Sequence, residues 1–239
     1  MNIIWGLSGS FMLTLLTIVY LPITIGFSLL VVIGTLHLVG QQAGISRLFI
    51  RQAISNFKLW QWSTTIITCI VALSVGLSNN ASSWQYIPYL PWLLILYLGF
   101  TTFLVINIVL QVQNKQQTLY LLMNQIMVIM IVVFLLMGYD LFVVLMPRLV
   151  HDSTAFIFYM VHDANRLEKS NGNLFYRVLH FKPSTILFGL PVIALGIALA
   201  LNSVLPQIVI LTITYFHYYI EGVAWKNGSI HRDNISIYA

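Results

Sequence analysis

The chain consists of apolar runs, each about as long as a helix that crosses a membrane. Of its 239 residues, 59% are hydrophobic and only 7% are charged, against about 25% charged in an ordinary soluble domain. So few charges cannot cover the surface of a water-soluble globule of this size. A helix satisfies its own backbone hydrogen bonds in lipid and needs about 20 residues to span it. The sequence therefore predicts an all-α, polytopic transmembrane helix bundle.

Hydropathy predicts roughly seven or eight spans in a chain of this length. We expect them at residues 3–20, 23–44, 60–78, 92–112, 119–146, 149–165, 185–205 and 207–225. The sixth is unusual and could be re-entrant, because its otherwise apolar segment contains His151, Asp152, His162 and Asp163. The short connections leave no room for an extramembrane domain, so we expect residues 1–239 to form a single transmembrane helical domain.

The basic residues indicate how the spans are oriented. With eight crossings and both termini in the cytoplasm, ten of the eleven Lys and Arg residues fall on the cytoplasmic side and only Arg148 falls outside, as the positive-inside rule requires. We expect an integral protein of a bacterial inner membrane. The net charge of +5 then reflects topology, and no nucleic-acid partner is expected. The one cysteine, Cys69, excludes a disulfide framework or a thiolate metal cluster.

Ionisable residues at membrane depth are costly and mark functional sites. His37 and His217 lie ten and nine residues before a cytoplasmic base, Arg47 and Lys226 respectively. At about 1.5 Å per residue, the two histidines share nearly the same depth. Each is followed one turn later by a polar residue on the same helical face. These residues are Gln41 after His37 and Glu221 after His217.

A third histidine, His162, lies four residues before Arg166 and within reach of this layer. Imidazoles with a carboxylate suit iron, zinc or copper, and the carboxylate favours non-haem iron. Helix bundles build such sites from inward-facing side chains. The predicted metal ligands are His37, His162, His217 and Glu221. Glu221 is a fourth ligand or a partner that fixes the His217 tautomer. Asp163, Gln41 and Asn107 are predicted to orient the site or a bound water.

His151 is expected to lie away from this layer. It precedes His162 by eleven residues, about 16 Å on a straight helix, which is too far for both to ligate one ion. Either His151 belongs to a second, outer polar cluster with Asp140 and Asp152, or the segment is broken. His231, in a predicted aqueous loop, is a further second-tier candidate.

The C-terminal residues 216–226, FHYYIEGVAWK, and 228–232, GSIHR, resemble the end of the Brp/Blh family, bacterial membrane proteins similar to β-carotene cleavage dioxygenases. Residues 36–40, LHLVG, and 161–163, VHD, follow in a comparable order. The resemblance implies a small helical bundle that holds a non-haem iron on histidines. This chain lacks the family's paired histidines one turn apart on a late helix, so the resemblance implies a mixed site that includes Glu221 or Asp163.

The leading hypothesis is an integral-membrane, metal-dependent oxygenase, most favourably with iron, that acts on a lipophilic substrate entering from the bilayer. An alternative is a proton-coupled transporter or channel component, in which the two polar clusters are stations on one path. A haem protein with two axial histidines also stays open. So does a non-catalytic subunit or assembly factor, for which membrane lipid, a complex partner or a second copy of the chain would be the contacts.

Overall fold

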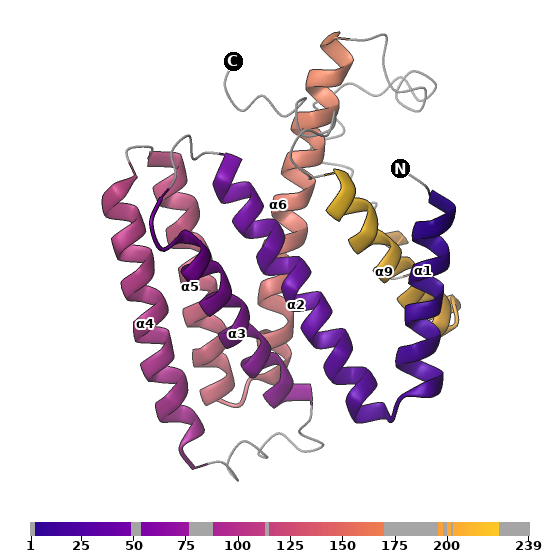
Figure 1. The fold of residues 1–239 in the computed structure, drawn as a ribbon, viewed down its shortest axis with the longest axis horizontal. Helices are drawn as coiled ribbons and strands as arrows, with labels where there is room; N and C mark the ends of the chain where they lie inside the picture. The colour runs from indigo at the N-terminus through magenta and orange to yellow at the C-terminus, as the bar shows by residue number, and fades with distance from the viewer. Residues whose placement is uncertain are drawn as a thin grey trace. The chain divides into compact units, whose positions relative to one another are not determined.

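The computed structural model describes residues 3–48, 54–76, 88–112, 115–169, 196–197, 200–201 and 203–224. In this part of the chain every regular element is a helix (Figure 1), which confirms the all-α prediction. The main elements are α1 (Ile3–Leu15), the π-helical η1 (Leu16–Tyr20), α2 (Ile23–Leu48), α3 (Phe57–Gly76), α4 (Leu90–Gln111), α5 (Lys115–Leu136), α6 (Asp140–Lys169) and α9 (Gln207–Ala224). The predicted seventh span, residues 185–205, lies largely outside the described residues.

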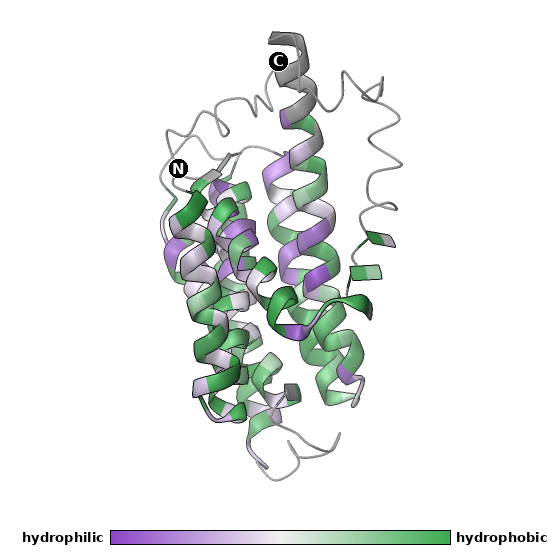
Figure 2. Cartoon of the chain, turned by 90° about the vertical axis from the view of Figure 1, so that its right-hand side faces the viewer, coloured by the Kyte–Doolittle hydropathy of each residue, from purple (hydrophilic) through white to green (hydrophobic). Residues whose placement is uncertain are grey.

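Several helices are long and apolar enough to cross a membrane. Among the described residues there are five such stretches: Ile3–Tyr20, Ile23–Arg47, Leu90–Gln111, Lys115–Leu136 and Asp140–Tyr159. Hydrophobic residues dominate the helices in Figure 2, and large apolar side chains such as Trp5 and Leu110 are exposed, as a lipid-facing surface requires. The chain is therefore built for insertion into a membrane. The predicted spans α3 and α9 are not among these five, so the total of eight stays a prediction.

The chain divides into two compact units. One comprises Ile23–His151, and the other comprises Met1–Pro22 with Asp152–Ala239. The division falls within α6, so the first part of that helix belongs to one unit and the rest to the other. The two units are described separately below, and the single transmembrane domain stays a prediction.

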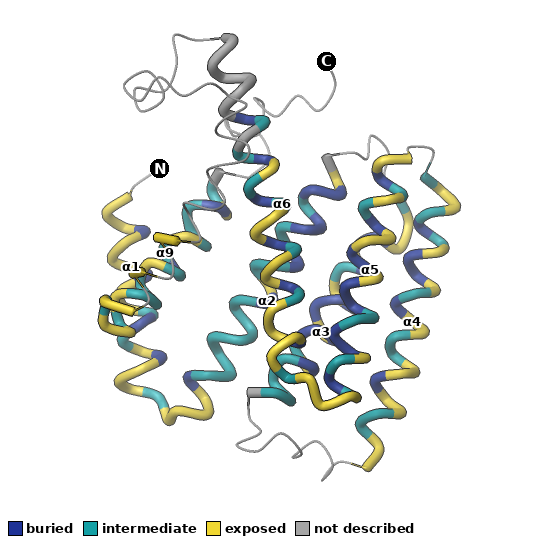
Figure 3. Tube along the Cα trace, turned by 180° about the vertical axis from the view of Figure 1, so that it is seen from behind, coloured by how far each residue is buried: buried dark blue, intermediate teal, exposed yellow. Residues whose placement is uncertain are grey.

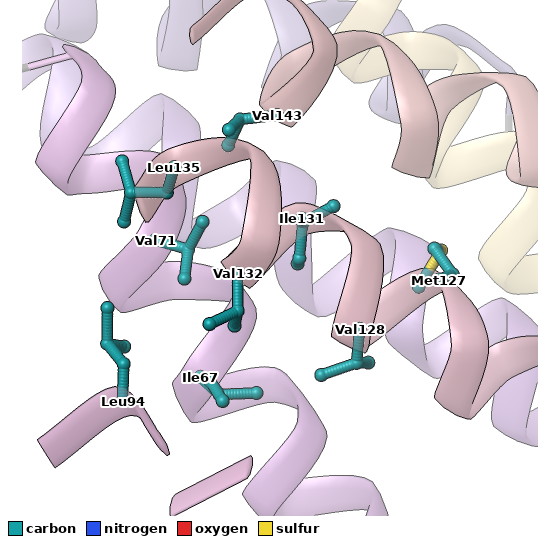
Figure 4. Packing of buried hydrophobic residues seen from close by; sticks show 9 residues of the cluster. All are labelled: Ile67, Val71, Leu94, Met127, Val128, Ile131, Val132, Leu135 and Val143. Carbon is teal, nitrogen blue, oxygen red and sulfur yellow. The ribbon is translucent and has the colours of Figure 1, made fainter. Parts of the chain in front are cut away.

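The unit Ile23–His151 has two apolar clusters along its helices. The first (Figure 4) contains Ile67, Val71, Leu94, Met127, Val128, Ile131, Val132, Leu135 and Val143. The second contains Ala43, Phe57, Trp60, Leu104, Val105, Ile108 and Leu121. The second cluster contains residues near the N-terminal ends of α3 and α5 and near the C-terminal ends of α2 and α4. Therefore α3 and α5 run in one direction and α2 and α4 in the other. Buried positions recur along α5 (Figure 3), which packs against α2, α3 and α4.

The predicted fifth span, residues 119–146, is wrong, because α5 ends at Leu136. Gly138 follows in the left-handed region with φ of 76°. Its amide donates to the carbonyl of Leu135, and the amide of Tyr139 donates to that of Phe134. The rings of Phe134 and Tyr139 lie 6.4 Å apart. These bonds and this apolar contact form a Schellman motif, which ends a helix and favours glycine.

Because the break comes at Gly138, α6 begins at Asp140 and not at residue 149. Arg148, predicted to lie in an outer loop, is inside this helix. Pro147 is also inside it. Asp140 lies in the first turn of α6, where a carboxylate interacts favourably with the helix dipole. The shift moves every later residue of α6 relative to the start of its span.

In the unit that contains both chain ends, α1 packs against α9 through small residues. Ser10 and Thr14 of α1 are buried, and their hydroxyls donate to carbonyls one turn earlier in the same helix. The Thr212 hydroxyl of α9 donates to that of Thr14 at 3.2 Å. Gly6 lies against the Tyr219 ring so closely that a Cβ atom at this position would clash with it. This contact fixes the rotation of α9 about its axis, and with it the directions of His217 and Glu221.

Candidate metal centre

In the unit Ile23–His151, α2 and α6 bring two histidine rings together. The ring centroids of His37 and His151 lie 5.1 Å apart, and the ring planes are inclined by 71°. His151 is buried and His37 is half-buried. With metal–nitrogen distances of about 2.0–2.1 Å and tetrahedral angles, the centroids of two imidazoles on one ion lie roughly 5 Å apart. The separation of this pair therefore suits two ligands of a single ion.

In the other unit, α9 presents a histidine and a carboxylate one turn apart. The Nε2 atom of His217 lies 3.6 Å from Oε1 of Glu221, which is 1% exposed. Two ligand atoms on one tetrahedral ion lie roughly 3.4 Å apart. The His217 side chain is 45% exposed, so it is the outer member of the pair. The predicted arrangement, in which the two residues share one helical face, is confirmed.

The carboxylate of Glu221 has a further partner on α6. The hydroxyl of Tyr159 donates a hydrogen bond to Oε1 of Glu221. A buried carboxylate is costly unless it is paired and hydrogen-bonded, and hydrogen bonds to a charged acceptor are roughly twice as strong as neutral ones. Tyr159 thus holds the carboxylate in one orientation. Sequence reasoning missed Tyr159, because a neutral tyrosine in an apolar span carries no signal until its neighbour on another helix is known.

Side chains that could hold a metal ion occur in both units: His37 and His151 in one, and His217 and Glu221 in the other. Nitrogen ligands with one carboxylate oxygen suit zinc, iron or copper. Three of these four residues were predicted ligands. The fourth was predicted to be His162, which is not among them although the structure describes it.

The predicted position of His151 is wrong, because α6 begins earlier in the sequence than expected. Eleven residues after Asp140, at about 1.5 Å per residue, His151 lies roughly 16 Å along the helix. That is near the middle of a hydrocarbon layer of about 30 Å. His162 comes roughly 33 Å along α6. His151 therefore lies near the middle of the span, beside His37, and not at the outer level predicted for it.

The other predicted site residues are distributed over the chain. Gln41 is half-buried on α2, one turn after His37. Asn107 on α4 donates its amide to the carbonyl of Phe103 at 2.9 Å, within its own helix. Asp152 is exposed on α6. The side chain of Asp163 and all of His231 lie outside the described residues.

Comparison with protein-family models, curated proteins and solved structures returned no match for this chain. The resemblance of residues 216–232 to the Brp/Blh family therefore stays a prediction.

Proposed function

We propose that this chain is an integral-membrane, metal-dependent oxygenase, with iron as the metal, that acts on a lipophilic substrate taken from the bilayer of a bacterial inner membrane. The observation that carries the proposal is the fully buried Glu221 beside His217. A carboxylate is expensive in a low-dielectric bundle. The separation between its oxygen and the imidazole nitrogen suits two ligands of one ion.

The second histidine pair supports the same chemistry. His37 and His151 have the ring separation of two imidazoles on one ion, and imidazole is a common ligand of iron, zinc and copper. Each unit thus has two donors at a separation that suits a single ion.

Bound iron would supply the activation of dioxygen. The residues of this chain would hold the metal and control its surroundings. Tyr159 fixes the Glu221 carboxylate through its hydrogen bond, and partners of this kind also set the basicity of a ligand. The apolar helices exclude bulk water from reactive species. Their lipid-exposed faces allow a lipophilic substrate to approach laterally.

Elemental analysis of the full chain, purified in mild detergent, tests the metal site. We expect bound metal in the wild type, since imidazole and carboxylate donors suit iron, zinc and copper. We expect its loss in His217→Ala and in Glu221→Gln. Asp152→Asn removes an exposed carboxyl and is the matched control, which should retain the ion. A wild type without metal, or an ion retained by both site variants, would overturn the proposal.

A labelling experiment tests the oxygenase activity separately. The iron-loaded protein in lipid nanodiscs is incubated with ¹⁸O₂ and a bacterial lipid extract, and the products are examined by mass spectrometry. We expect ¹⁸O in a lipid product with the wild type and none with His217→Ala. If metal binds but no lipid gains ¹⁸O, the result supports the metal site and contradicts the oxygenase activity. A visible spectrum of the same sample detects haem.

A further inference from the structure

The unit Ile23–His151 contains a second set of buried polar side chains, which the candidate metal centre does not use. Along α3, Trp60, Thr64 and Thr68 follow at intervals of one turn and are 1%, 2% and 4% exposed. Along α5, Gln117 and Gln125 are 3% and 4% exposed. Residues eight apart span roughly 12 Å of helix. Because α3 and α5 run in the same direction, both rows of polar side chains begin at the same end of the bundle and continue to its middle.

These side chains have hydrogen-bonding atoms that no described residue satisfies. The atoms are Nε1 of Trp60, Oγ1 of Thr64, Oγ1 of Thr68, Nε2 of Gln117 and Oε1 of Gln125. The Gln125 amide nitrogen is satisfied, because it donates to the hydroxyls of Thr101 and Thr102 at 3.2 and 2.9 Å. An unsatisfied buried polar group costs about 1–3 kcal/mol. Five unsatisfied polar atoms within one bundle therefore indicate that a bound molecule forms hydrogen bonds with them.

Thr64 and Thr68 of α3 differ from the hydroxyl residues around them. Thr65 donates to the carbonyl of Gln61 at 2.9 Å, and Thr101 donates to that of Leu98 at 3.0 Å. Such a bond to the preceding turn is open to a threonine in any helix. Thr64 and Thr68 do not make it, although both are buried in the same helix as Thr65. Their hydroxyls are therefore available to a partner outside their own helix.

The hydrogen-bonding character of the five atoms indicates what kind of molecule would bind them. Two are N–H donors, one is an amide acceptor, and two are hydroxyls that can donate and accept. None of the side chains is charged, and the N–H groups oppose a cation. Water both donates and accepts, and buried waters in proteins make about three hydrogen bonds to such groups.

We propose that bound water molecules occupy the interior of this bundle along α3 and α5, from Trp60 and Gln117 to Gln125. Gln125 lies ten residues into the 22-residue α5, at about half the depth of a span. The waters would make a hydrogen-bonded path from one membrane face to the middle of the bilayer. Lys58 and Lys115 lie at the outer end of the two helices, which by the positive-inside rule is the cytoplasmic face. The path is independent of the metal centre.

Radiolytic hydroxyl-radical footprinting tests this proposal on the full chain in detergent, because bound water generates radicals that label adjacent side chains. We expect Trp60 to be labelled although its side chain is only 1% exposed. The double variant Thr64→Val with Thr68→Val should lower Trp60 labelling several-fold. Thr65→Val, whose hydroxyl is satisfied within the helix, is the matched control and should leave the labelling unchanged.

Thermal unfolding of the same variants gives a second measurement. If no water is bound along α3 and α5, each valine removes an unsatisfied hydroxyl and should raise the melting temperature. If water is bound there, the double variant should melt at the same or a lower temperature. Background labelling of Trp60 together with a raised melting temperature would overturn the proposal. A small molecule bound stoichiometrically at this position, detected by native mass spectrometry, would also overturn it.

Discussion

The hydroxyl of Tyr159 on α6 donates a hydrogen bond to the buried carboxylate of Glu221 on α9. The donor is a neutral hydroxyl, so this hydrogen bond orients the carboxylate without adding a positive charge beside it. Nε2 of His217, one turn earlier on α9, lies 3.6 Å from the same carboxylate oxygen.

Tyr159→Phe should weaken metal binding without abolishing it. The variant removes the hydrogen bond that orients Glu221 but leaves every proposed ligand in place. Loss of such a partner typically lowers metal affinity about 10–100-fold. Titration with a chelator of known affinity measures the change. Tyr139→Phe, an exposed tyrosine on the other unit, is the control, and equal affinities in the two variants would contradict the assigned role.

His151→Ala and His162→Ala should have opposite effects on metal content, although both histidines lie buried on α6. The first removes one of the four candidate ligands, and we expect the purified protein to lose its ion. The second removes a histidine that is not among the four, and we expect the ion to stay. Elemental analysis of the two variants decides the matter. The reverse result would restore the ligand set predicted from the sequence.

Gly138→Ala should destabilise the fold by about 1–2 kcal/mol, the cost of a left-handed conformation for a residue with a Cβ atom. Gly138 has φ of 76°. Gly99, in the middle of α4 with open space around it, is the matched control. Alanine there should be neutral or stabilising, since glycine is the weaker helix former. Unfolding in mixed detergent micelles measures both variants, and equal stabilities would argue against the Schellman turn.

Gly6→Ala should separate α1 from α9, because the added methyl group would overlap the Tyr219 ring. Overpacking of this kind typically costs about 1–3 kcal/mol. Gly9→Ala on the same helix meets nothing within 4 Å and should be tolerated. Circular dichroism during thermal unfolding compares the two. A melting temperature for Gly6→Ala as high as that for Gly9→Ala would show that the helices do not approach so closely.

Several features of the fold followed from local signals. Leu21-Pro22 ends the first span because proline interrupts a helix, and the described helices lie close to most of the predicted spans. The His217–Glu221 pair also followed, since its spacing of four residues places both side chains on one face. These predictions needed only the geometry of a single helix.

The incorrect or missing predictions concern residues whose position depends on where a helix ends or on contact with a second helix. Gly138 is a C-terminal helix signal inside a long apolar run, and the predicted fifth span followed the hydropathy of the run through it. That single boundary changed the expected depths of His151 and His162. The contact of Tyr159 with Glu221 and the buried hydroxyls of Thr64 and Thr68 depend on neighbouring helices. A search restricted to ionisable residues does not detect them.

The glycine turn has a consequence for insertions and deletions. His151 stands thirteen residues after Gly138 on an unbroken helix. One residue added or removed between them would turn His151 by about 100° and shift it by about 1.5 Å, away from His37. The length of this interval is therefore as constrained as the identity of the histidine. In any relative that keeps the histidine pair, length changes should accumulate in the connections between helices and spare the segment from Gly138 to His151.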